Sequence, residues 1–322
     1  MIRERQKIEI MKLFRLLSFT VCILCLSGWR PARADAQLVA SLDVLGPNVT
    51  MRRAGTDTFV NISKETLVGV GDTVRTSPTA RARITFFANG TDTEVQPSSE
   101  IQIDDFSGTE DKFTISLTVV LGQTTQRIAK LLDSNSSYTI NSTGLELAVR
   151  GTSFDVRVEP SGRSALIVKT GAVATKNTGA PSATSAQVGP GFGVRAEAGK
   201  GLSDVVRASS FAQLDSALDG CGALISTAGD VRLNVRTGPG LGFARIGQLG
   251  NNFRQGVLGV TETTKWYRVV FKGGFGWVYA PALKLDATCP GLRTFPDTFG
   301  PEDTSLYQGL EPGYSPDPTA QP

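Results

Sequence analysis

Hydrophobic and polar side chains alternate along most of residues 48–195, with the period of half-buried β-strands. Apolar residues fall on every second position of 81–88, and the longer run 113–121 follows the same pattern. The Asn89-Gly90 pair is typical of a tight hairpin turn. Helical spacing is nearly absent, apart from a short candidate turn at Gln126–Leu132. The pattern predicts an all-β domain, built as a sandwich, a roll or a short solenoid.

A regular hairpin pattern occupies Ala148–Thr175, where two apolar runs flank a Pro-Ser-Gly turn. We expect Gly151 to adopt a backbone conformation that a β-carbon would obstruct. We expect Arg150 to satisfy backbone carbonyls or a carboxylate and not to act in catalysis. A structural role is therefore predicted for the motif residues Val149, Arg150, Gly151, Thr152 and Phe154.

The alternation gives way to a flexible join and then to helical spacing. Apolar residues recur every three or four positions within Asp204–Asp219, Ser203 is placed to cap the start, and Gly220 to end it. We expect a short helix that packs its apolar side on a neighbouring domain.

A second strand-rich module covers Val231–Leu285. It opens with the sequence L-N-V-R-T-G-P (233–239), continues with W-Y-R-V (266–269) and closes with G-W-V (276–278).

The first β-rich region resembles FecR-like domains, which are known for periplasmic signalling. The resemblance rests on V-R-G-T-S-F (149–154), on G-D-T-V-R-T (71–76), on the strand before Asn89 and on the V-G-P-G turn (188–191). It implies an exported β-domain that contacts another molecule. FecR regulators of the signalling kind also carry a sigma-factor-binding cytoplasmic segment and a membrane helix. This sequence shows neither, so control of a sigma factor is not carried over.

The second module resembles the bacterial SH3-type (SH3b) domain of exported proteins, on its L-N-V-R-x-G-P opening and later G-W-V. The resemblance implies a small SH3-like barrel. It also implies binding of cell-wall peptidoglycan or peptides, although many members have no known ligand.

Residues 1–34 have the pattern of a secretory signal peptide. A basic segment precedes the charge-free stretch Leu16–Trp29, which as a helix spans roughly 21 Å, less than the roughly 30 Å hydrocarbon core of a bilayer. Ala32-Arg33-Ala34 fits a cleavage site, and either Met1 or Met11 could be the true start. We therefore expect a secreted or extracytoplasmic protein, in the periplasm or at the cell surface, with no stable membrane span in the mature chain.

Charge and cysteine content follow from this export prediction. Residues 1–34 carry seven Lys/Arg and two Glu, so removing their +5 from the whole-chain +3 leaves −2, and no nucleic-acid partner is indicated. Cys221 and Cys289 remain and bracket the second module, where we predict a disulfide worth about 4 kcal/mol. Residues 290–322 are acidic and rich in Pro and Gly, so we expect a disordered tail.

Aromatic residues of the second module are the best candidates for ligand contact. Trp266 shares a face with Arg268 and Val270, whereas the aromatic residues of 275–279 share another. Any single aromatic is more readily explained as core. The module has eight Lys/Arg and three acids, a net +5. This charge favours an anionic partner, or else it pairs with the chain's own acidic tail or merely keeps the module soluble. The candidate ligand-binding residues are Trp266, Tyr267, Phe275, Trp277, Tyr279 and Arg236.

No histidine occurs in the chain, which excludes Ser-His-Asp and Cys-His catalysis and His-ligated zinc. The acidic pairs Asp104-Asp105 and Glu110-Asp111 lack calcium-loop spacing. We therefore predict no metal, no cofactor and no catalytic residue. A hydrolase that uses only carboxylates is the remaining enzymatic hypothesis.

The sequence thus predicts an all-β protein with one short helix and five segments. These are a signal peptide (1–34), a FecR-like domain (35–198), a linker with a helix (199–220), an SH3-type domain (221–289) and a tail (290–322). The expected function is non-catalytic binding at the cell envelope, in which the SH3-type module docks to peptidoglycan or peptide and the FecR-like domain engages an envelope protein. The alternative is an extracytoplasmic sensing component that acts with a separate membrane protein.

Overall fold

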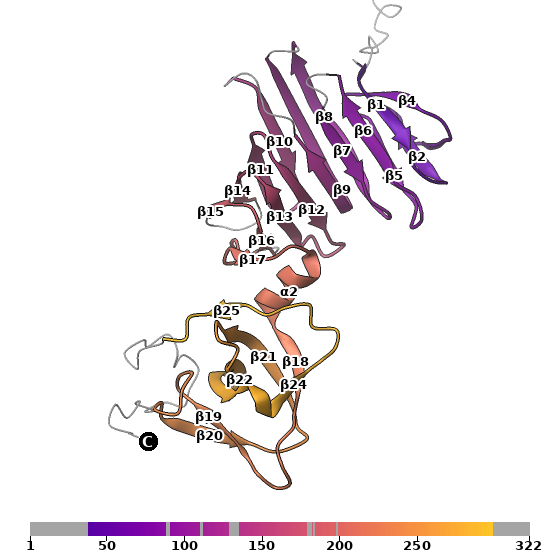
Figure 1. Ribbon diagram of the computed structural model, residues 1–322. Helices are drawn as coiled ribbons and strands as arrows, with labels where there is room; N and C mark the ends of the chain where they lie inside the picture. Colours follow the sequence, from indigo (N-terminus) through magenta and orange to yellow (C-terminus); the bar gives the residue numbers. More distant parts are fainter. Residues whose placement is uncertain are drawn as a thin grey trace, which may run out of the picture. The chain divides into compact units, whose positions relative to one another are not determined.

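The computed structural model describes residues 38–87, 91–109, 112–128, 135–178, 182, 184–197 and 199–298. Several predicted features lie outside these residues. They are the signal peptide, the Asn89-Gly90 turn, most of the candidate turn at Gln126–Leu132, the Glu110-Asp111 pair and residues 299–322 of the tail. Strands dominate the described chain, which confirms the all-β fold with one short helix (Figure 1).

The N-terminal β-domain comprises strands β1 to β17. Their bounds are β1 Leu38–Val44, β2 Val49–Arg52, β3 Phe59–Ile62, β4 Thr66–Gly69, β5 Thr73–Thr76, β6 Ala82–Phe86, β7 Asp92–Val95, β8 Glu100–Gly108, β9 Phe113–Arg127, β10 Ser137–Asn141, β11 Leu145–Val149, β12 Ser153–Val158, β13 Ser164–Thr170, β14 Val173–Asn177, β15 Ser185–Val188, β16 Phe192–Ala196 and β17 Val206–Arg207.

These strands form two sheets that share β9. One sheet runs β4-β1-β6-β7-β9-β12-β13-β16-β17, and the other runs β3-β2-β5-β8-β9-β10-β11-β14-β15. Pairing is antiparallel except between β9 and β10. Strands β6 and β7 form the hairpin that the Asn89-Gly90 pair predicted, with Ala82 opposite Val95.

Strand β9 changes sheet at Gly122. Its first part, up to Leu121, pairs with β8 and β10, and its second part, from Gly122, pairs with β7 and β12. Gly122 has a φ of +85°, and a β-carbon there would lie 2.5 Å from the Cα of Ser99. Only glycine fits this bend, which lets one strand contribute to both sheets.

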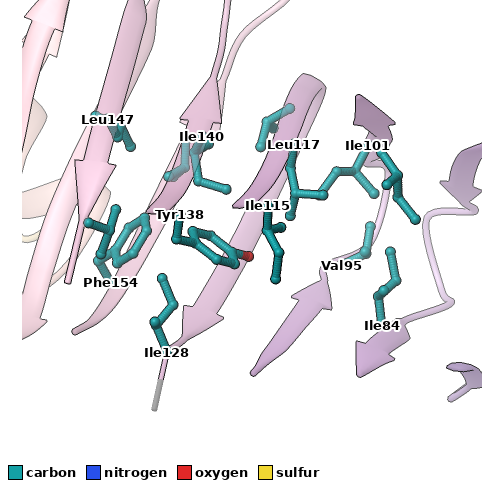
Figure 2. Close-up of a cluster of buried hydrophobic side chains, with 14 of the residues drawn as sticks. Ile84, Val95, Ile101, Ile115, Leu117, Ile128, Tyr138, Ile140, Leu147 and Phe154 are labelled. Atoms are coloured by element: carbon teal, nitrogen blue, oxygen red, sulfur yellow. The ribbon is translucent and has the colours of Figure 1, made fainter. Parts of the chain in front are cut away.

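The two sheets bury one common hydrophobic core. Alternate residues of each strand point inward, so that the side chains of Ile84 and Val95 from one sheet meet those of Ile101 and Leu117 from the other (Figure 2). Of the predicted architectures, the structure has the sandwich, in which two sheets pack on a shared core. The period-2 pattern buries one face of each sheet.

One polar network lies inside this core. The Tyr138 hydroxyl donates to Oε1 of Gln126 at 3.0 Å, and the Thr93 hydroxyl also donates to that oxygen. Burial raises the pKa of Tyr138 well above its ordinary value of 10.0. The phenol therefore stays neutral, and its hydrogen bonds offset the cost of placing polar groups in an apolar interior.

Helix α2 spans Phe211–Asp219 and is shorter than the predicted Asp204–Asp219. The helix starts late because β17 pairs with β16 just before it, and because the Ser210 side chain accepts from the Gln213 backbone N–H as N-cap. Gly220 ends it as predicted. The apolar side, with Phe211 and Leu214, packs on Ala165 and Ile167 of β13.

A charged cluster adds to this packing of α2 on the sheet. The Arg195 guanidinium, only 6% exposed, donates to both carboxylate oxygens of Asp219 at 2.6 and 2.7 Å. Arg157 donates to both oxygens of Asp215 at 2.9 Å. The Arg195 guanidinium also holds the pKa of Asp219 below its ordinary value of 3.8.

The C-terminal β-domain comprises strands β18 to β25. Their bounds are β18 Cys221–Ile225, β19 Leu233–Arg236, β20 Arg245–Leu249, β21 Arg254–Thr261, β22 Trp266–Phe271, β23 Gly274–Tyr279, β24 Leu283–Leu285 and β25 Thr294–Phe295, with a 3-10 turn at Ala280–Ala282. The sheet order is β20-β19-β23-β22-β21-β18-β24, and β25 pairs with β21.

The predicted disulfide joins Cys221 to Cys289, with 5.7 Å between their Cα atoms. It connects the first strand of the C-terminal β-domain to the segment that follows the last long strand. The two cysteines therefore close this domain at its ends, as their positions in the sequence predicted.

The expectation of a disordered tail from residue 290 is wrong for residues 290–298. Thr294 and Phe295 form β25, which pairs in parallel with Val260 and Thr261, and the Phe295 side chain is only 9% exposed. The composition of this stretch predicts disorder, but one residue, Phe295, is buried against Trp266 and Trp277 and holds the stretch on the sheet.

Candidate functional site

The motifs of the N-terminal β-domain have a structural role. Asp72 is completely buried and accepts hydrogen bonds from Arg53 Nη1 at 2.6 Å and from the backbone N–H groups of Ala54 and Gly69 at 2.9 Å. A buried carboxylate with three donors ties the β2–β3 turn to the end of β4. The G-D-T-V-R-T sequence therefore organises turns.

The V-R-G-T-S-F segment likewise forms the bend between β11 and β12. Gly151 has a φ of +57°, as its predicted role requires, while Thr152 and Phe154 are buried. Val149 is buried at the end of β11, and Arg150 is exposed in the bend. The predicted partners of Arg150 stay a prediction.

The register of the β22–β23 hairpin brings the candidate aromatics of the C-terminal β-domain together. Trp266 lies opposite Tyr279, Arg268 opposite Trp277, and Val270 opposite Phe275. The two sets that were predicted on different faces therefore share one face of the hairpin. The sequence could not show this because the pairing register depends on the turn at residues 272–273.

Three of the predicted ligand residues are used in packing. Tyr267 points to the opposite face and packs against the main core of the domain. Trp277 is completely buried and meets the Phe295 ring edge-on, with 5.7 Å between ring centroids. Phe275 is buried beneath the Arg268 guanidinium, which lies 3.6 Å from its ring centroid. These residues hold the fold together and leave little surface for a ligand.

The other three candidates meet at a groove of about 740 Å³. Tyr279, 51% exposed, and the largely buried Trp266 form one part of the lining, with ring centroids 5.9 Å apart. Arg236 lines it from β19 and donates to the carbonyl oxygens of Leu241 and Phe243, at 3.0 and 2.8 Å. The arginine thereby fixes the loop that forms another wall.

Two apolar residues that the sequence did not single out complete the groove. Val231 and Leu241 are 60% and 70% exposed, and both line the groove, so they add apolar surface to it. The signal was their place beside the L-N-V-R-T-G-P motif, Val231 two residues before it and Leu241 two residues after it.

The charged side chains that line the groove are all positive. Arg232 and Arg236 line it, and its described lining contains no Asp or Glu. Aromatic and aliphatic surfaces next to guanidinium groups suit a ligand with an apolar or sugar body and carboxylate groups. The other lining residues are Thr227, Leu233, Asn234, Gly240 and Ala282.

Two further surveys cover the described part of the chain. None of its helices is both long and apolar enough to cross a membrane. Within the same residues, His, Cys, Asp and Glu form no group of three or more that could hold a metal ion.

Comparison with known proteins gives two family matches. Residues 72–174 match the model described as FecR protein, and residues 231–284 match the model described as bacterial SH3 domain. No curated protein matches the chain.

Two crystal structures of a candidate anti-sigma factor from Parabacteroides distasonis are similar in fold. One is 14% identical and covers 49% of this chain and 68% of its own, and the other is 15% identical and covers 48% and 67%. Both have a TM-score of 0.36, so the folds correspond only in part and no function follows from the likeness. The family matches agree with the V-R-G-T-S-F and L-N-V-R-T-G-P motifs: this chain carries a FecR domain followed by a bacterial SH3 domain.

Proposed function

We propose that this protein is an exported, non-catalytic sensing component of the cell envelope. Its SH3 groove binds a wall-derived ligand, and its FecR domain passes the signal to a separate membrane protein by direct contact. The pattern of residues 1–34 supports export, and the FecR match supports a role in signalling.

The observation that carries the proposal is the groove at Trp266, Tyr279 and Arg236. It is concave, lined by aromatic and aliphatic surface, and supplied with guanidinium groups but no carboxylates. Peptidoglycan fragments match this chemistry, since their sugar rings stack on aromatic side chains and their stem peptides carry carboxylates. By contrast, the FecR motif residues are occupied with turns and core packing.

Ligand binding is tested by co-sedimentation of the full chain with purified peptidoglycan sacculi. Tyr279→Ala removes an exposed groove residue, and we expect it to lower the bound fraction by about five- to tenfold, as for an aromatic hot spot. Val270→Ala is the matched control, because Val270 is 44% exposed on the same hairpin face but does not line the groove.

A folded wild-type chain that stays in the supernatant at low and moderate salt contradicts wall binding. Equal losses for Tyr279→Ala and Val270→Ala place the ligand elsewhere on the domain. Salt-sensitive binding that Tyr279→Ala leaves unchanged indicates simple charge attraction to the basic domain.

The contact with a membrane protein is tested in cells by photo-crosslinking. Phe87, which follows β6, and Val60 of β3 are 56% and 50% exposed on the FecR-containing domain, so each can be replaced by a photoreactive residue. We expect one of them to capture a membrane protein, with a yield that changes in the Tyr279→Ala background. Capture that is the same in both backgrounds contradicts sensing and supports passive attachment to the wall.

A further inference from the structure

The segment Pro290–Thr298, here called the strap, follows the disulfide and lies along β21. Strand β18 pairs with the first part of β21, and the strap pairs with the last part through β25. Without the strap, the backbone of Val260–Glu262 would form an open sheet edge. Open edges are the sites at which extended peptides add to sheets.

Backbone and side-chain contacts hold the strap on the last part of β21. Val260 N–H donates to the Arg293 carbonyl at 2.9 Å, and Glu262 N–H donates to the Phe295 carbonyl at 3.0 Å. Thr263 donates to the Asp297 carboxylate twice, from its backbone N–H at 3.1 Å and from its hydroxyl at 2.6 Å. The parallel pairing of Val260 with Thr294 and of Thr261 with Phe295 completes the contact.

A notch in the sheet receives the Phe295 ring. A β-carbon at Gly259 would lie 2.2 Å from the ring and 2.8 Å from the Arg293 carbonyl oxygen, so the seat exists only because residue 259 is glycine. The ring packs edge-on against Trp277, and the Arg268 guanidinium lies 4.9 Å from its centroid. Together these groups form a pocket for one aromatic side chain beside the edge of β21.

The strap beyond Leu292 is separable from the main core of the domain, whereas Leu292 itself packs against that core. Phe295 clusters with Trp266 and Trp277 on one face of the hairpin, whereas Val269, Phe271 and Val278 build the main core on the other. The ladder with β21 involves two strap residues only. The disulfide at Cys289 lies before the strap, so release of residues 293–298 leaves the covalent closure of the domain intact.

We propose that β21, Gly259, Trp277 and Thr263 form a peptide-binding site that the strap occupies in cis. The partner is an extended peptide that adds parallel to β21, with an aromatic residue at the Phe295 position and a carboxylate two residues later. It binds by displacing the strap. This inference does not rest on the proposed function, although Trp266 borders both the groove and the strap pocket.

The test measures binding of a fluorescently labelled peptide of residues 291–298 to the full chain by anisotropy. The tethered strap competes at high effective concentration in the wild type. Phe295→Ala weakens the strap and leaves its seat intact, so we expect the peptide to bind this variant about tenfold more tightly or better. Phe253→Ala is the matched control, because Phe253 is 61% exposed and lies outside the strap site.

Two further variants make the outcome decisive. Gly259→Val in the Phe295→Ala chain fills the notch and is expected to abolish binding, and a peptide with Ala in place of Phe is expected not to bind. Should Phe295→Ala fail to fold, Asp297→Ala removes only the contact with Thr263 and is expected to give a smaller gain. If folded strap variants bind the peptide no better than wild type, or if Phe253→Ala gives the same gain, the strap is a fixed part of the fold and the proposal is wrong.

Discussion

Trp277 and Tyr279 lie two positions apart on one face of β23 and yet have opposite roles. Trp277 is buried by the strap, and Tyr279 is half exposed at the groove. The alternation of the sequence predicts their shared face. It cannot predict which of them is covered, because the covering residue, Phe295, comes from a segment whose composition indicates a tail.

Replacement of the two residues separates stability from binding. Trp277→Ala is expected to lower the free energy of unfolding of the C-terminal β-domain by about 3–5 kcal/mol, since it leaves a large cavity. Tyr279→Ala, at the surface, is expected to change it by less than about 1 kcal/mol. Thermal unfolding followed by tryptophan fluorescence or circular dichroism compares them, and equal effects would contradict this assignment.

At the scale of elements, helix α2 is held to the N-terminal β-domain by apolar packing and by charge. The sequence correctly predicts its apolar side and its C-cap, but places its start seven residues too early. Val206 favours a strand and Arg207 favours a helix, so the local preferences conflict, and pairing with β16 decides their conformation. Local sequence cannot contain that information.

The charge contribution predicts a loss of stability in acid. Arg195 lowers the pKa of Asp219 in the folded state below 3.8, so this ion pair stabilises the fold above that pH. The stabilisation is lost as the pH falls through the lower folded-state pKa, because the folded carboxylate must then be protonated. Asp219→Asn removes the titrating group and is expected to melt at a lower temperature than wild type at pH 5.

The difference in melting temperature between wild type and Asp219→Asn is expected to narrow as the pH is lowered from 5 to 2.5. Thermal unfolding of both chains by circular dichroism across this range measures it. A gap that stays constant with pH would show that Asp219 acts through neutral hydrogen bonds alone.

At the scale of the whole molecule, the sequence predicts the two β-modules, the helix between them and the disulfide, because each leaves a local pattern. The division of strands between two sheets is not local. In the sequence, Gly122 looks like an ordinary turn glycine, but in the structure it is the point at which β9 passes from one sheet to the other. The groove is predicted only in part. Val231 and Leu241 line it together with Trp266 only because the fold brings these three residues to one site.

The disulfide gives a prediction for the C-terminal β-domain as a unit. It closes a loop with a sequence separation of 68 residues. The double variant Cys221→Ser, Cys289→Ser is expected to lose about 4 kcal/mol of unfolding free energy in the chain-entropy model. Chemical denaturation of this domain measures the loss. A variant as stable as wild type would show that packing alone determines the closed state.

The position of β9 also has a consequence for the order in which the chain is made. Residues 38–127 contain every strand on one side of β9, whereas β10 and β12, which cover its other side, come later in the chain. A nascent chain that has just completed β9 therefore presents a long strand with one bare edge in each sheet, a state prone to self-association. Self-association is therefore most favoured in the interval before residue 158, the end of β12, emerges.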